Sequence, residues 1–315
     1  MGNSNRAIII NIAFVLIGLI YIVRLFMLQV VDPSYKFYAE SNTQRKLTQY
    51  PSRGLIYDRN GKLLVANQPV YDLMIVPREV APFDTLAFSQ ALGLPLEQVR
   101  KLFQEVRNNL RSRKISSFKP SVFYKQLSAE QYAVLQEQLY LFKGFFAQRR
   151  TVRKYEYPLA AHVFGYVAET NENHLKNDAY YSLGDYTGIS GIERSYEHFL
   201  RGQKGARYIL VDVHGREKGP MRGGRLDTAA VAGKDVTLTL DIDLQAYGEL
   251  LMQNKSGSVV AIEPSTGEIL SLVSSPGYDP ALLIGRERSR NFPALVTDSL
   301  SPLLNRAIMS GYPPG

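Results

Sequence analysis

Serine, lysine and asparagine fall into three short patterns that could carry out acyl transfer. Ser116 and Lys119 have Ser-x-x-Lys spacing, residues 255–257 read Lys-Ser-Gly, and residues 289–291 read Ser-x-Asn. In Ser-x-x-Lys chemistry the amine must reach the hydroxyl, so both side chains must lie on successive turns of one helix. Pro120 directly follows Lys119 and disfavours helical backbone at that lysine. We therefore predict no nucleophile at Ser116, because patterns this short arise by chance in 315 residues.

Other kinds of chemistry have less support. The chain has no cysteine, and its four histidines are dispersed without the spacing of metal ligands, so we predict no metal site and no cofactor. Gly233-Lys234 lacks the earlier glycine of a phosphate loop, and Asp235 stands where serine or threonine is needed. Arg53 and Asp58 could be a catalytic pair. Because no nucleophile or histidine lies near them in sequence, we interpret them as a structural ion pair beside a hairpin.

The composition indicates a globular protein of about two domains, because 45% of the 315 residues are apolar and 21% are charged. The formal net charge of +8 could suit nucleic acid, but no nucleic-acid-binding motif accompanies it, and anionic lipid headgroups are an equally good partner. Basic residues gather at positions 107–119 and in the pairs Arg149-Arg150 and Arg153-Lys154. We interpret them as solvated faces, with a lipid or partner contact as the alternative.

An uncharged apolar stretch covers residues 7–23 and continues past Arg24 to residue 31. A membrane-spanning helix needs ~20 apolar residues, and a charged side chain near its end can reach the interface. We predict one uncleaved transmembrane helix over residues 7–31, with a cytoplasmic tail at residues 1–6 because Arg6 favours that orientation. A cleaved signal peptide fits less well, since its apolar core is usually ~7–15 residues and precedes a small-residue cleavage site.

Turn residues between apolar segments predict two hairpins. Asn60-Gly61 lies between apolar segments, and this dipeptide is a strong hairpin signal. Residues 257–263 and 268–274 flank a Pro-Ser-Thr-Gly turn. Residues 236–240 indicate a further strand, which leads into a helix that begins at Asp241.

Helical signals fill residues 78–156. Asp84 can cap a short helix that ends at Gly93, Pro95 can begin a longer one, and a capping box at Ser128 begins another. We therefore expect a small mixed α/β subdomain in this region.

The glycine-rich stretch at residues 188–202 is typical of one capped helix. Gly191 allows the backbone freedom at the start of this helix, and Gly202 ends the helix. Glu193 complements the positive charge at the N-terminal end of the helix.

In their order along the chain, these motifs resemble those of the class B penicillin-binding proteins. Residues 53–61, Arg-Gly-Leu-Ile-Tyr-Asp-Arg-Asn-Gly, are similar to the first signature of the family's pedestal domain, and residues 157–167, 188–202 and 211–216 are similar to later ones. Residues 257–270, followed by Leu-Asn-Arg-Ala and Tyr-Pro-Pro-Gly, resemble the start of the transpeptidase domain. The resemblance covers nearly the whole chain and is closer to the elongation type than to the division type.

The resemblance implies that the nucleophilic serine of a Ser-x-x-Lys motif comes immediately after Gly315. This chain would then hold no catalytic residue and be inactive as given. The internal patterns are also in the wrong order for the family, because the Lys-Ser-Gly pattern precedes the Ser-x-Asn pattern. The positions implied to be structural motif residues are Arg53, Gly54, Asp58, Gly61, Gly191, Glu193 and Gly202.

The implied fold class is α+β. It consists of a single N-terminal transmembrane helix, an elongated mixed α/β pedestal with β-hairpins and a small helical insertion at about 78–156, and the incomplete start of an α/β transpeptidase domain. The expected boundaries are 1–6 for the cytoplasmic tail, 7–31 for the helix, 32–234 for the dimerisation or pedestal domain and 235–315 for the truncated start of the transpeptidase domain. We expect a truncated chain, because it ends inside a domain and not at a linker.

Two functions of different classes are implied. The first is penicillin-sensitive D,D-transpeptidation of peptidoglycan in cell-wall elongation and shape maintenance, from a single-pass position in the inner membrane with most of the chain in the periplasm. The second is a non-catalytic, membrane-anchored module that docks and activates a glycan polymerase. The implied partners are that polymerase, other elongation-complex proteins and, for the intact protein, stem peptides, but no nucleic acid. An unrelated β-rich anchored adhesin is a weaker third hypothesis.

Overall fold

The computed structural model describes residues 14–24, 26–27, 44–182, 184–211 and 217–311. The chain divides into two compact units. Unit 1 comprises residues 1–48 and 206–228, and unit 2 comprises residues 49–205 and 229–315.

Unit 1 contains a helix at residues 14–24 and a three-stranded sheet. The sheet has the order β1-β8-β9, formed by β1 (Gln44–Gln49), β8 (Gly205–Val211) and β9 (Glu217–Pro220). The 3-10 helix η4 (Met221–Gly224) follows, and Ile209 and Met221 are buried.

The transmembrane helix predicted over residues 7–31 falls partly outside the described residues. Within the described residues, no helix has both the length and the apolar character needed to cross a membrane. The side chains of residues 14–24 are mostly exposed.

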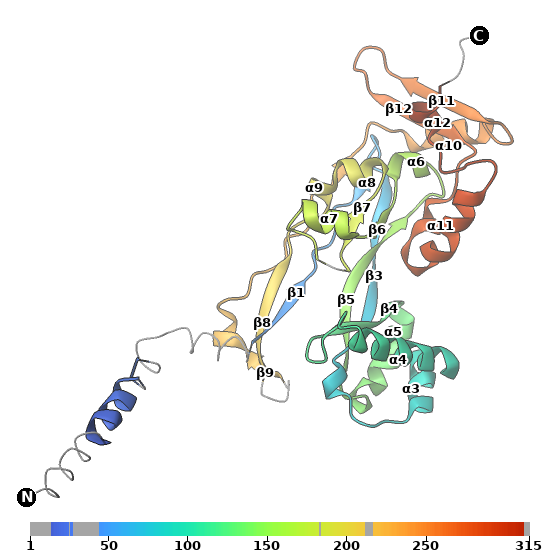
Figure 1. Ribbon diagram of the computed structural model, residues 1–315. Coiled ribbons are helices and arrows are strands. Elements are labelled where there is room, and N and C mark those ends of the chain that lie inside the picture. The colour runs from blue at the N-terminus through green and yellow to red at the C-terminus, as the bar shows by residue number, and fades with distance from the viewer. Residues whose placement is uncertain (1–13, 25, 28–43, 183, 212–216, 312–315) are drawn as a thin grey trace, which may run out of the picture. The chain divides into compact units, whose positions relative to one another are not determined.

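Unit 2 is built on a five-stranded sheet around the 13-residue strand β3 (Leu63–Ile75). This strand pairs antiparallel with β2 (Ile56–Tyr57), β4 (Ser121–Leu127) and β5 (Phe145–Tyr155), and β10 (Val236–Thr237) pairs in parallel with β2. The ladder between β3 and β5 is continuous from the pair Val65 and Tyr155 to the pair Ile75 and Phe145. Figure 1 shows these two strands side by side through the middle of the unit.

The predicted hairpin at Asn60-Gly61 is confirmed, because β2 and β3 are antiparallel on either side of it. Gly61 has a φ of +80°, which favours glycine. Asp58 is fully buried, and one of its carboxylate oxygens accepts the backbone N–H groups of Asn60 and Lys62 at 2.8 and 2.7 Å. These two bonds fix the turn.

A first hydrophobic core covers one end of β3 and β5. Three helices pack there: α3 (Thr85–Leu92), α4 (Leu96–Arg111) and α5 (Ala129–Gln138). Phe88 lies at its centre, with its ring centroid 4.8 Å from those of both Phe142 and Phe145. The short helices η2 (Pro77–Glu79) and η3 (Leu139–Leu141) join these elements.

The helix starts predicted in this region are confirmed. The Asp84 side chain accepts from Leu86 N at the start of α3, and Gly93 ends that helix in the left-handed conformation. Both hydrogen bonds of the capping box at Ser128 are present. The region expected as a helical insertion also contains β4 and β5, so its helices and the central sheet share one core.

A second hydrophobic core lies at the other end of the sheet. Phe164, Leu200 and Ile242 are buried in it together with Ile56, Leu64 and Val65 of β2 and β3. The elements of this part of unit 2 are α6 (Ala161–Phe164), β6 (Val167–Glu169), α7 (Glu172–Asn177), β7 (Tyr186–Gly188), α8 (Gly191–Ser195), α9 (Glu197–Leu200) and α10 (Ile242–Leu251).

Two of the elements predicted here are shorter than expected. The single helix predicted after Gly191 is wrong, because the chain breaks into α8 and α9 at Tyr196, where φ is −106° and ψ is 18°. The strand predicted at residues 236–240 covers only Val236–Thr237, because its partner β2 has two residues.

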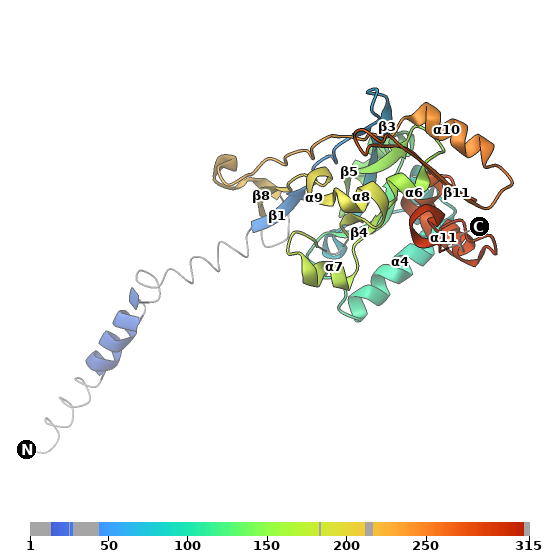
Figure 2. The same cartoon turned by 90° about the horizontal axis from the view of Figure 1, so that it is seen from above.

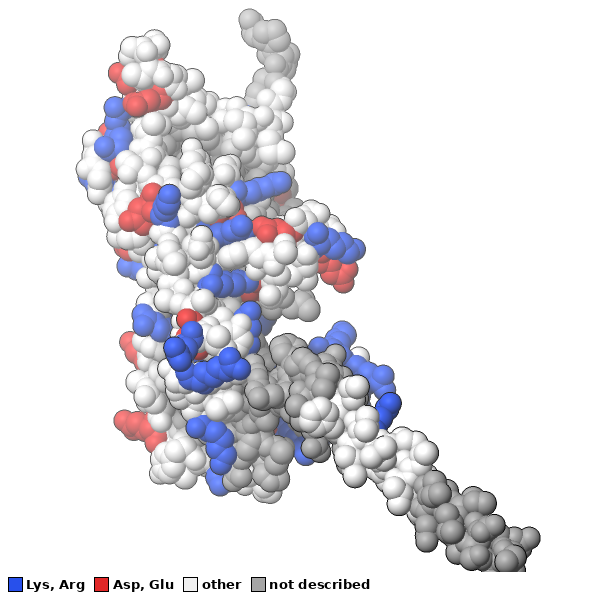
Figure 3. Space-filling view, turned by 90° about the vertical axis from the view of Figure 1, so that its left-hand side faces the viewer, with Lys and Arg blue, Asp and Glu red and all other residues white. Residues whose placement is uncertain are grey.

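The predicted C-terminal hairpin is confirmed as β11 (Gly257–Ile262) paired antiparallel with β12 (Ile269–Ser275). Helix α10 lies against β12, and Figure 1 shows α10 beside the hairpin. Figure 2 shows the same part of the chain from above. The remaining elements are η5 (Pro280–Leu283), η6 (Gly285–Glu287), α11 (Arg288–Thr297) and α12 (Arg306–Met309). On the face drawn in Figure 3, charges of both signs are interspersed over the described residues.

Candidate functional site

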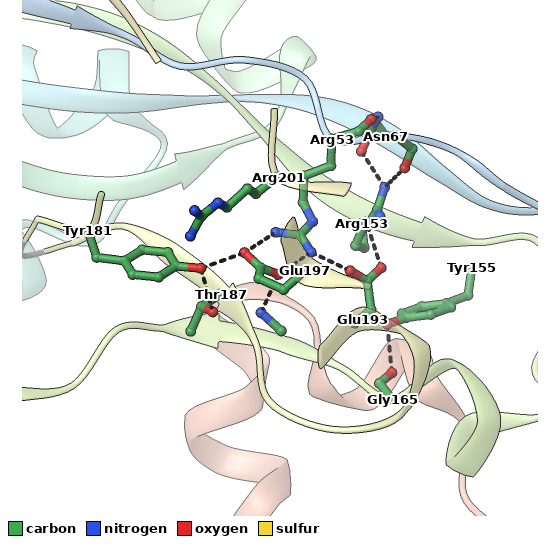
Figure 4. A network of polar contacts seen from close by, with 12 residues as sticks. Arg53, Asn67, Arg153, Tyr155, Gly165, Tyr181, Thr187, Glu193, Glu197 and Arg201 are labelled. Atoms are coloured by element: carbon green, nitrogen blue, oxygen red, sulfur yellow. Dashed lines mark hydrogen bonds and ion pairs between the residues drawn. The ribbon is translucent and has the colours of Figure 1, made fainter. Parts of the chain in front are cut away.

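Two arginines and two glutamates form a network inside unit 2, which we call the arginine–glutamate network (Figure 4). Arg53 precedes β2, Arg153 lies on β5, Glu193 lies on α8 and Glu197 lies on α9. Arg53 contacts Glu197 through both Nη atoms, at 3.1 and 2.6 Å, and Glu193 through Nη2 at 2.7 Å. The second oxygen of Glu193 accepts from Arg153 Nε at 2.6 Å.

Surrounding groups use further donors and acceptors of the network. Arg153 Nη1 donates to Gly54 O at 2.8 Å and to Asn67 Oδ1 at 2.9 Å. Glu197 accepts from the Tyr181 hydroxyl at 2.8 Å and from Gly188 N at 2.9 Å. The network therefore connects β3, β5, β7, α8 and α9.

Burial makes these ion pairs strong. Glu193 is fully buried, and Arg153 is 4% exposed. Burial alone would raise the pKa of Glu193, but the positive charges of Arg153 and Arg53 outweigh it and hold that pKa below its ordinary value. Burial also acts to lower the pKa of Arg53, and the two carboxylates raise it above its ordinary value. Glu193 and Arg53 are thus held ionised, which suits a structural role and not proton transfer.

The structure corrects three interpretations of these charged residues. Arg53 does not pair with Asp58 as expected, because its guanidinium contacts Glu193 and Glu197 while Asp58 is occupied by the hairpin turn. Glu193 binds two arginines and is not merely a charge at a helix end. Arg153 is buried and not part of a solvated face, because its guanidinium contacts Glu193, Gly54 O and Asn67.

Arg150 was also expected on a solvated face and is instead buried, with 8% exposure. Its Nε lies 3.1 Å from Asp72 Oδ2, and its Nη1 donates to Gly184 O at 2.6 Å. By contrast, the interpretation of a solvated position holds for Lys154, because its side chain is 53% exposed.

Three of the four motif glycines lie where backbone segments approach each other closely. A Cβ on Gly54 would be 1.8 Å from Lys234 O, and one on Gly202 would be 2.4 Å from Val231 O. Gly191 has a φ of +58°, and a Cβ there would be 2.4 Å from Val163 O. Gly61 also has positive φ, but the space around it is open.

A second set of contacts fastens the last described segment, and the sequence did not indicate it. Ser274 Oγ on β12 accepts from Arg306 N at 3.0 Å and donates to Leu304 O at 3.1 Å. Arg306 is 9% exposed, and its guanidinium donates to the carbonyl oxygens of Leu300 and Ser301 at 2.6 and 3.1 Å. The backbone that leads to the end of the chain is thereby attached to the hairpin.

Gln245 joins α10 to the same hairpin. It is fully buried, and its Oε1 accepts from Leu272 N at 2.8 Å while its Nε2 donates to Leu272 O at 2.9 Å. Nε2 also donates to Glu249, which accepts Ala160 N at 2.7 Å. These bonds connect the hairpin, α10 and the segment before α6.

The three short patterns considered first do not assemble into a site. As predicted, Ser116 and Lys119 do not lie on successive turns of a helix, because residues 116–119 lie in a loop. Residues 255–257 lead into β11, whereas residues 289–291 lie in α11, where Asn291 donates to Leu282 O.

Two protein-family domains match this chain, one after the other along the sequence. The Penicillin-binding Protein dimerisation domain matches residues 48–238, and the Penicillin binding protein transpeptidase domain matches residues 257–315. The chain belongs to the penicillin-binding proteins. The resemblance seen in the sequence is thus confirmed, as is the mixed α/β fold with a dimerisation domain and part of a transpeptidase domain.

Similar curated proteins are peptidoglycan D,D-transpeptidases MrdA. The one from Escherichia coli (strain K12) is 33% identical over 98% of this chain and 49% of the relative, and the one from Haemophilus influenzae is 30% identical over 99% and 48%. The chain spans about half the length of the curated relatives it matches. These relatives support the elongation type.

Two solved structures from Helicobacter pylori are similar. A complex between Penicillin-Binding Protein (PBP2) and MreC has a TM-score of 0.63 at 25% identity, covering 84% of this chain and 48% of that chain. Penicillin-Binding Protein (PBP2) alone has a TM-score of 0.56 at 25% identity, covering 83% and 49%.

The first prediction compares Gly191→Ala with Gly61→Ala. Both positions have positive φ, so alanine costs about 1–2 kcal/mol at each. At Gly191 the new Cβ also meets the Val163 carbonyl, and crowding of this kind adds about 1–3 kcal/mol. Urea unfolding should show the larger loss of stability for Gly191→Ala. Equal losses would show that the close approach has no energetic importance.

The second prediction concerns Glu193→Gln. Removing one partner of a buried pair typically costs about 3–5 kcal/mol, whereas Glu268→Gln, beside the partly exposed Arg59, should cost under about 1 kcal/mol. Because the folded-state pKa of Glu193 lies below its ordinary 4.5, its contribution is complete above that pH and is lost as the pH falls through the folded pKa. Urea unfolding from pH 7 to pH 3 should show the difference between native and Glu193→Gln chains shrinking on acidification. A difference that does not change with pH would contradict this account.

Proposed function

We propose that this chain forms the pedestal and the first part of the transpeptidase domain of a penicillin-sensitive D,D-transpeptidase, which crosslinks peptidoglycan during cell-wall elongation. The observation that carries the proposal is the ordered match of both penicillin-binding protein domains, at residues 48–238 and 257–315. The second hypothesis, a purely non-catalytic module, is not favoured because the match continues into the transpeptidase domain.

Four segments make up the proposed organisation. They are a cytoplasmic tail at 1–6, a transmembrane helix at 7–31, a pedestal at 32–234 with its insertion at about 78–156, and the start of the transpeptidase domain at 235–315. The short parallel pairing of β10 with β2 and the second hydrophobic core both support a firm attachment between the last two segments.

The network and the glycine contacts give the pedestal its proposed role. Acyl transfer requires that the nucleophile and the oxyanion donors stay in place to within a fraction of an ångström. Glu193 and Arg53 fix the elements that support α10 and the C-terminal hairpin, and Ser274 and Arg306 fix the segment that leads to the expected serine. In this proposal the motif positions Arg53, Gly54, Asp58, Gly61, Gly191, Glu193 and Gly202 set shape, and catalysis depends on residues beyond Gly315.

The third prediction tests the catalytic proposal. Acylation needs a serine hydroxyl activated by a neighbouring base, and removing the nucleophile leaves only binding and oxyanion stabilisation. The purified 315-residue chain should therefore not become covalently labelled by a fluorescent penicillin, whereas a chain extended through the natural downstream sequence should be labelled.

Ser116→Ala is the matched control for this labelling. Label on the 315-residue chain that disappears with Ser116→Ala would show that the Ser116 and Lys119 pattern is catalytic. Absence of label on an extended chain that is folded would contradict the proposed transpeptidase activity.

The proposed location is the inner membrane, crossed once, with most of the chain in the periplasm. The apolar stretch at residues 7–31 and Arg6 support this topology. The proposed partners are a membrane glycan polymerase and other elongation-complex proteins, bound through the transmembrane helix and the hairpin around Arg53 to Ala66. The similar Helicobacter pylori protein in complex with MreC supports a partner of the elongation complex.

The fourth prediction joins location and partner. The full chain should sediment with membranes and co-purify with the polymerase from detergent, because the helix provides both the anchor and part of the contact. Deleting residues 7–31 should abolish both, whereas deleting residues 236–315 should abolish neither. A chain without residues 7–31 that still fractionates with membranes would contradict the topology. Loss of co-purification of a well-folded pedestal on removal of residues 236–315 would contradict the partner contact.

A further inference from the structure

The last described residues of the chain, 300–311, lead toward the position of the expected serine, and we call them the approach segment. Its backbone turns inward at Pro302, which is buried, whereas Leu300 is 63% exposed. Arg306, later in the same segment, donates to the carbonyl oxygens of Leu300 and Ser301. One buried guanidinium therefore holds two consecutive carbonyl groups.

His162 on α6 binds the carbonyl group of the next residue. The ring of His162 forms a hydrogen bond with the backbone of Pro302, and because proline has no N–H, a ring N–H donates to the carbonyl oxygen. Nε2 of His162 is buried and has no hydrogen-bond partner, so the donor is Nδ1. The carbonyl groups of residues 300–302 thus all accept from basic side chains, and His162 is the one that comes from the proposed pedestal.

The surroundings of the His162 ring disfavour a positive charge on it. Burial lowers the pKa of His162 below its ordinary value of 6.5, and the charge of Arg306 lowers it further, while the bond to Pro302 offsets them only in part. Tyr278 packs against the ring, with the two centroids 5.4 Å apart. Burial raises the pKa of Tyr278 to about 12, so its hydroxyl carries no negative charge at neutral pH. His162 is therefore neutral at neutral pH.

The carboxylates on the elements around α6 bind other groups. Glu193 on α8 lies in the arginine–glutamate network, and Glu249 on α10 accepts from Ala160 N. Asp279, next to the tyrosine that covers the ring, accepts from Ala281 N. Strand β12 also contacts α6 and contains no ionisable residue. Within the described residues, a proton added to the free ring nitrogen would thus have no acceptor.

Both sides of this contact have strained backbone. Ala160 at the start of α6 has a φ of 55°, and Ser301 has a φ of 48°. Residues other than glycine rarely adopt this left-handed conformation and keep it only where surrounding contacts hold it. These contacts are the bonds of Glu249 to Ala160 N and of Arg306 to Ser301 O. The two backbone segments that meet at the histidine are thus each fixed in one conformation.

We propose that His162 is a positioning residue for the expected serine: the neutral ring holds the approach segment against α6, and a second proton on the ring weakens that attachment. The inference deepens the proposed function and rests on it in one respect, namely that the approach segment leads to a catalytic serine. Through this contact the pedestal acts on the segment directly, and not only through α10 and the hairpin.

The attachment should depend on pH in one direction. With the approach segment detached, Pro302 and Arg306 no longer cover the ring, and His162 titrates near its ordinary 6.5. In the attached form the ring takes up the proton only at lower pH. The attachment is therefore complete above about pH 6.5 and weakens as the pH falls from there through the pKa of the attached form.

Amide hydrogen exchange of the 315-residue chain, followed by mass spectrometry, tests the attachment. The amides of Leu304 and Arg306 donate to Ser301 O and Ser274 Oγ, so their protection reports whether the approach segment is attached. Between pH 7.5 and pH 5.5, after correction for intrinsic exchange rates, this protection should fall about five- to tenfold. These pH values stay above 4.5, below which the contribution of Glu193 is lost.

His162→Asn separates the hydrogen bond from the titration, because its side-chain amide keeps an N–H donor near the place of Nδ1 and does not ionise. This variant should keep the protection seen at pH 7.5 and lose the pH dependence. His162→Leu removes the donor and should lower the protection about fivefold at both pH values. The matched control is His198→Asn on α9, which replaces an exposed histidine and should leave the pH dependence unchanged.

The chain extended through the natural downstream sequence gives the readout on acylation. His162→Leu should slow labelling by a fluorescent penicillin about tenfold at pH 7.5, because the serine is then less well placed. His162→Asn should restore the rate to near that of the native chain.

Native protection that does not change between pH 7.5 and pH 5.5 would overturn the proposal, whether or not the variants fold. The same pH dependence in the native chain and in His162→Asn would also overturn it, as would equal labelling rates for His162→Leu and His162→Asn. A native extended chain without label would instead reject the proposed function. Normal labelling beside exchange that does not depend on His162 would reject this inference alone.

Discussion

The fold of unit 2 depends on one buried negative charge. The carboxylate of Glu193 has no contact with solvent and is shared by Arg53 and Arg153, which lie 140 and 40 residues away along the chain. Burying a carboxylate is unfavourable unless cations and hydrogen bonds surround it, so Glu193 can stay buried only while both arginines are in place. The same requirement brings Gly191 against the backbone of Val163, because α8 has to approach closely for Glu193 to reach both arginines.

Local elements of this fold could be predicted from the sequence, because their causes lie within a few residues. Asp84, Ser128 and Asn60-Gly61 each act on backbone groups that are two to four residues away, so their capping and turn roles are visible in the sequence. The C-terminal hairpin follows from the same kind of signal. The break at Tyr196 could not be predicted, because the two Glu side chains on either side of it have to face arginines supplied by β5 and by the segment before β2.

Residues of the candidate site were harder to assign than elements. The sequence picked out Arg53 and Glu193 but paired neither correctly, since a partner 140 residues away leaves no local signal. Arg153 was read as solvated because it stands in a basic run, and its burial depends on contacts with Glu193, Gly54 and Asn67, which are distant in the sequence. The spacing of Glu193 and Glu197, one helical turn apart, was the available signal that two carboxylates face the same way. Ser274 gave no such signal in the sequence, because a single serine in a strand can have many roles.

The continuous ladder between β3 and β5 has a consequence for how this unit folds. Each of the two strands contributes side chains to both hydrophobic cores. Separating β3 from β5 at one core therefore exposes apolar side chains of the other core as well. The turn that closes the ladder is not a short loop, because α3, α4, β4 and α5 all lie between Ile75 and Phe145. The contacts between β3 and β5 therefore join residues that are far apart in the sequence, and contacts of this kind slow folding because a long loop must close first. Until that loop closes, the edge of β3 that pairs with β5 stays open, and an unpaired strand edge of this length can associate with other chains.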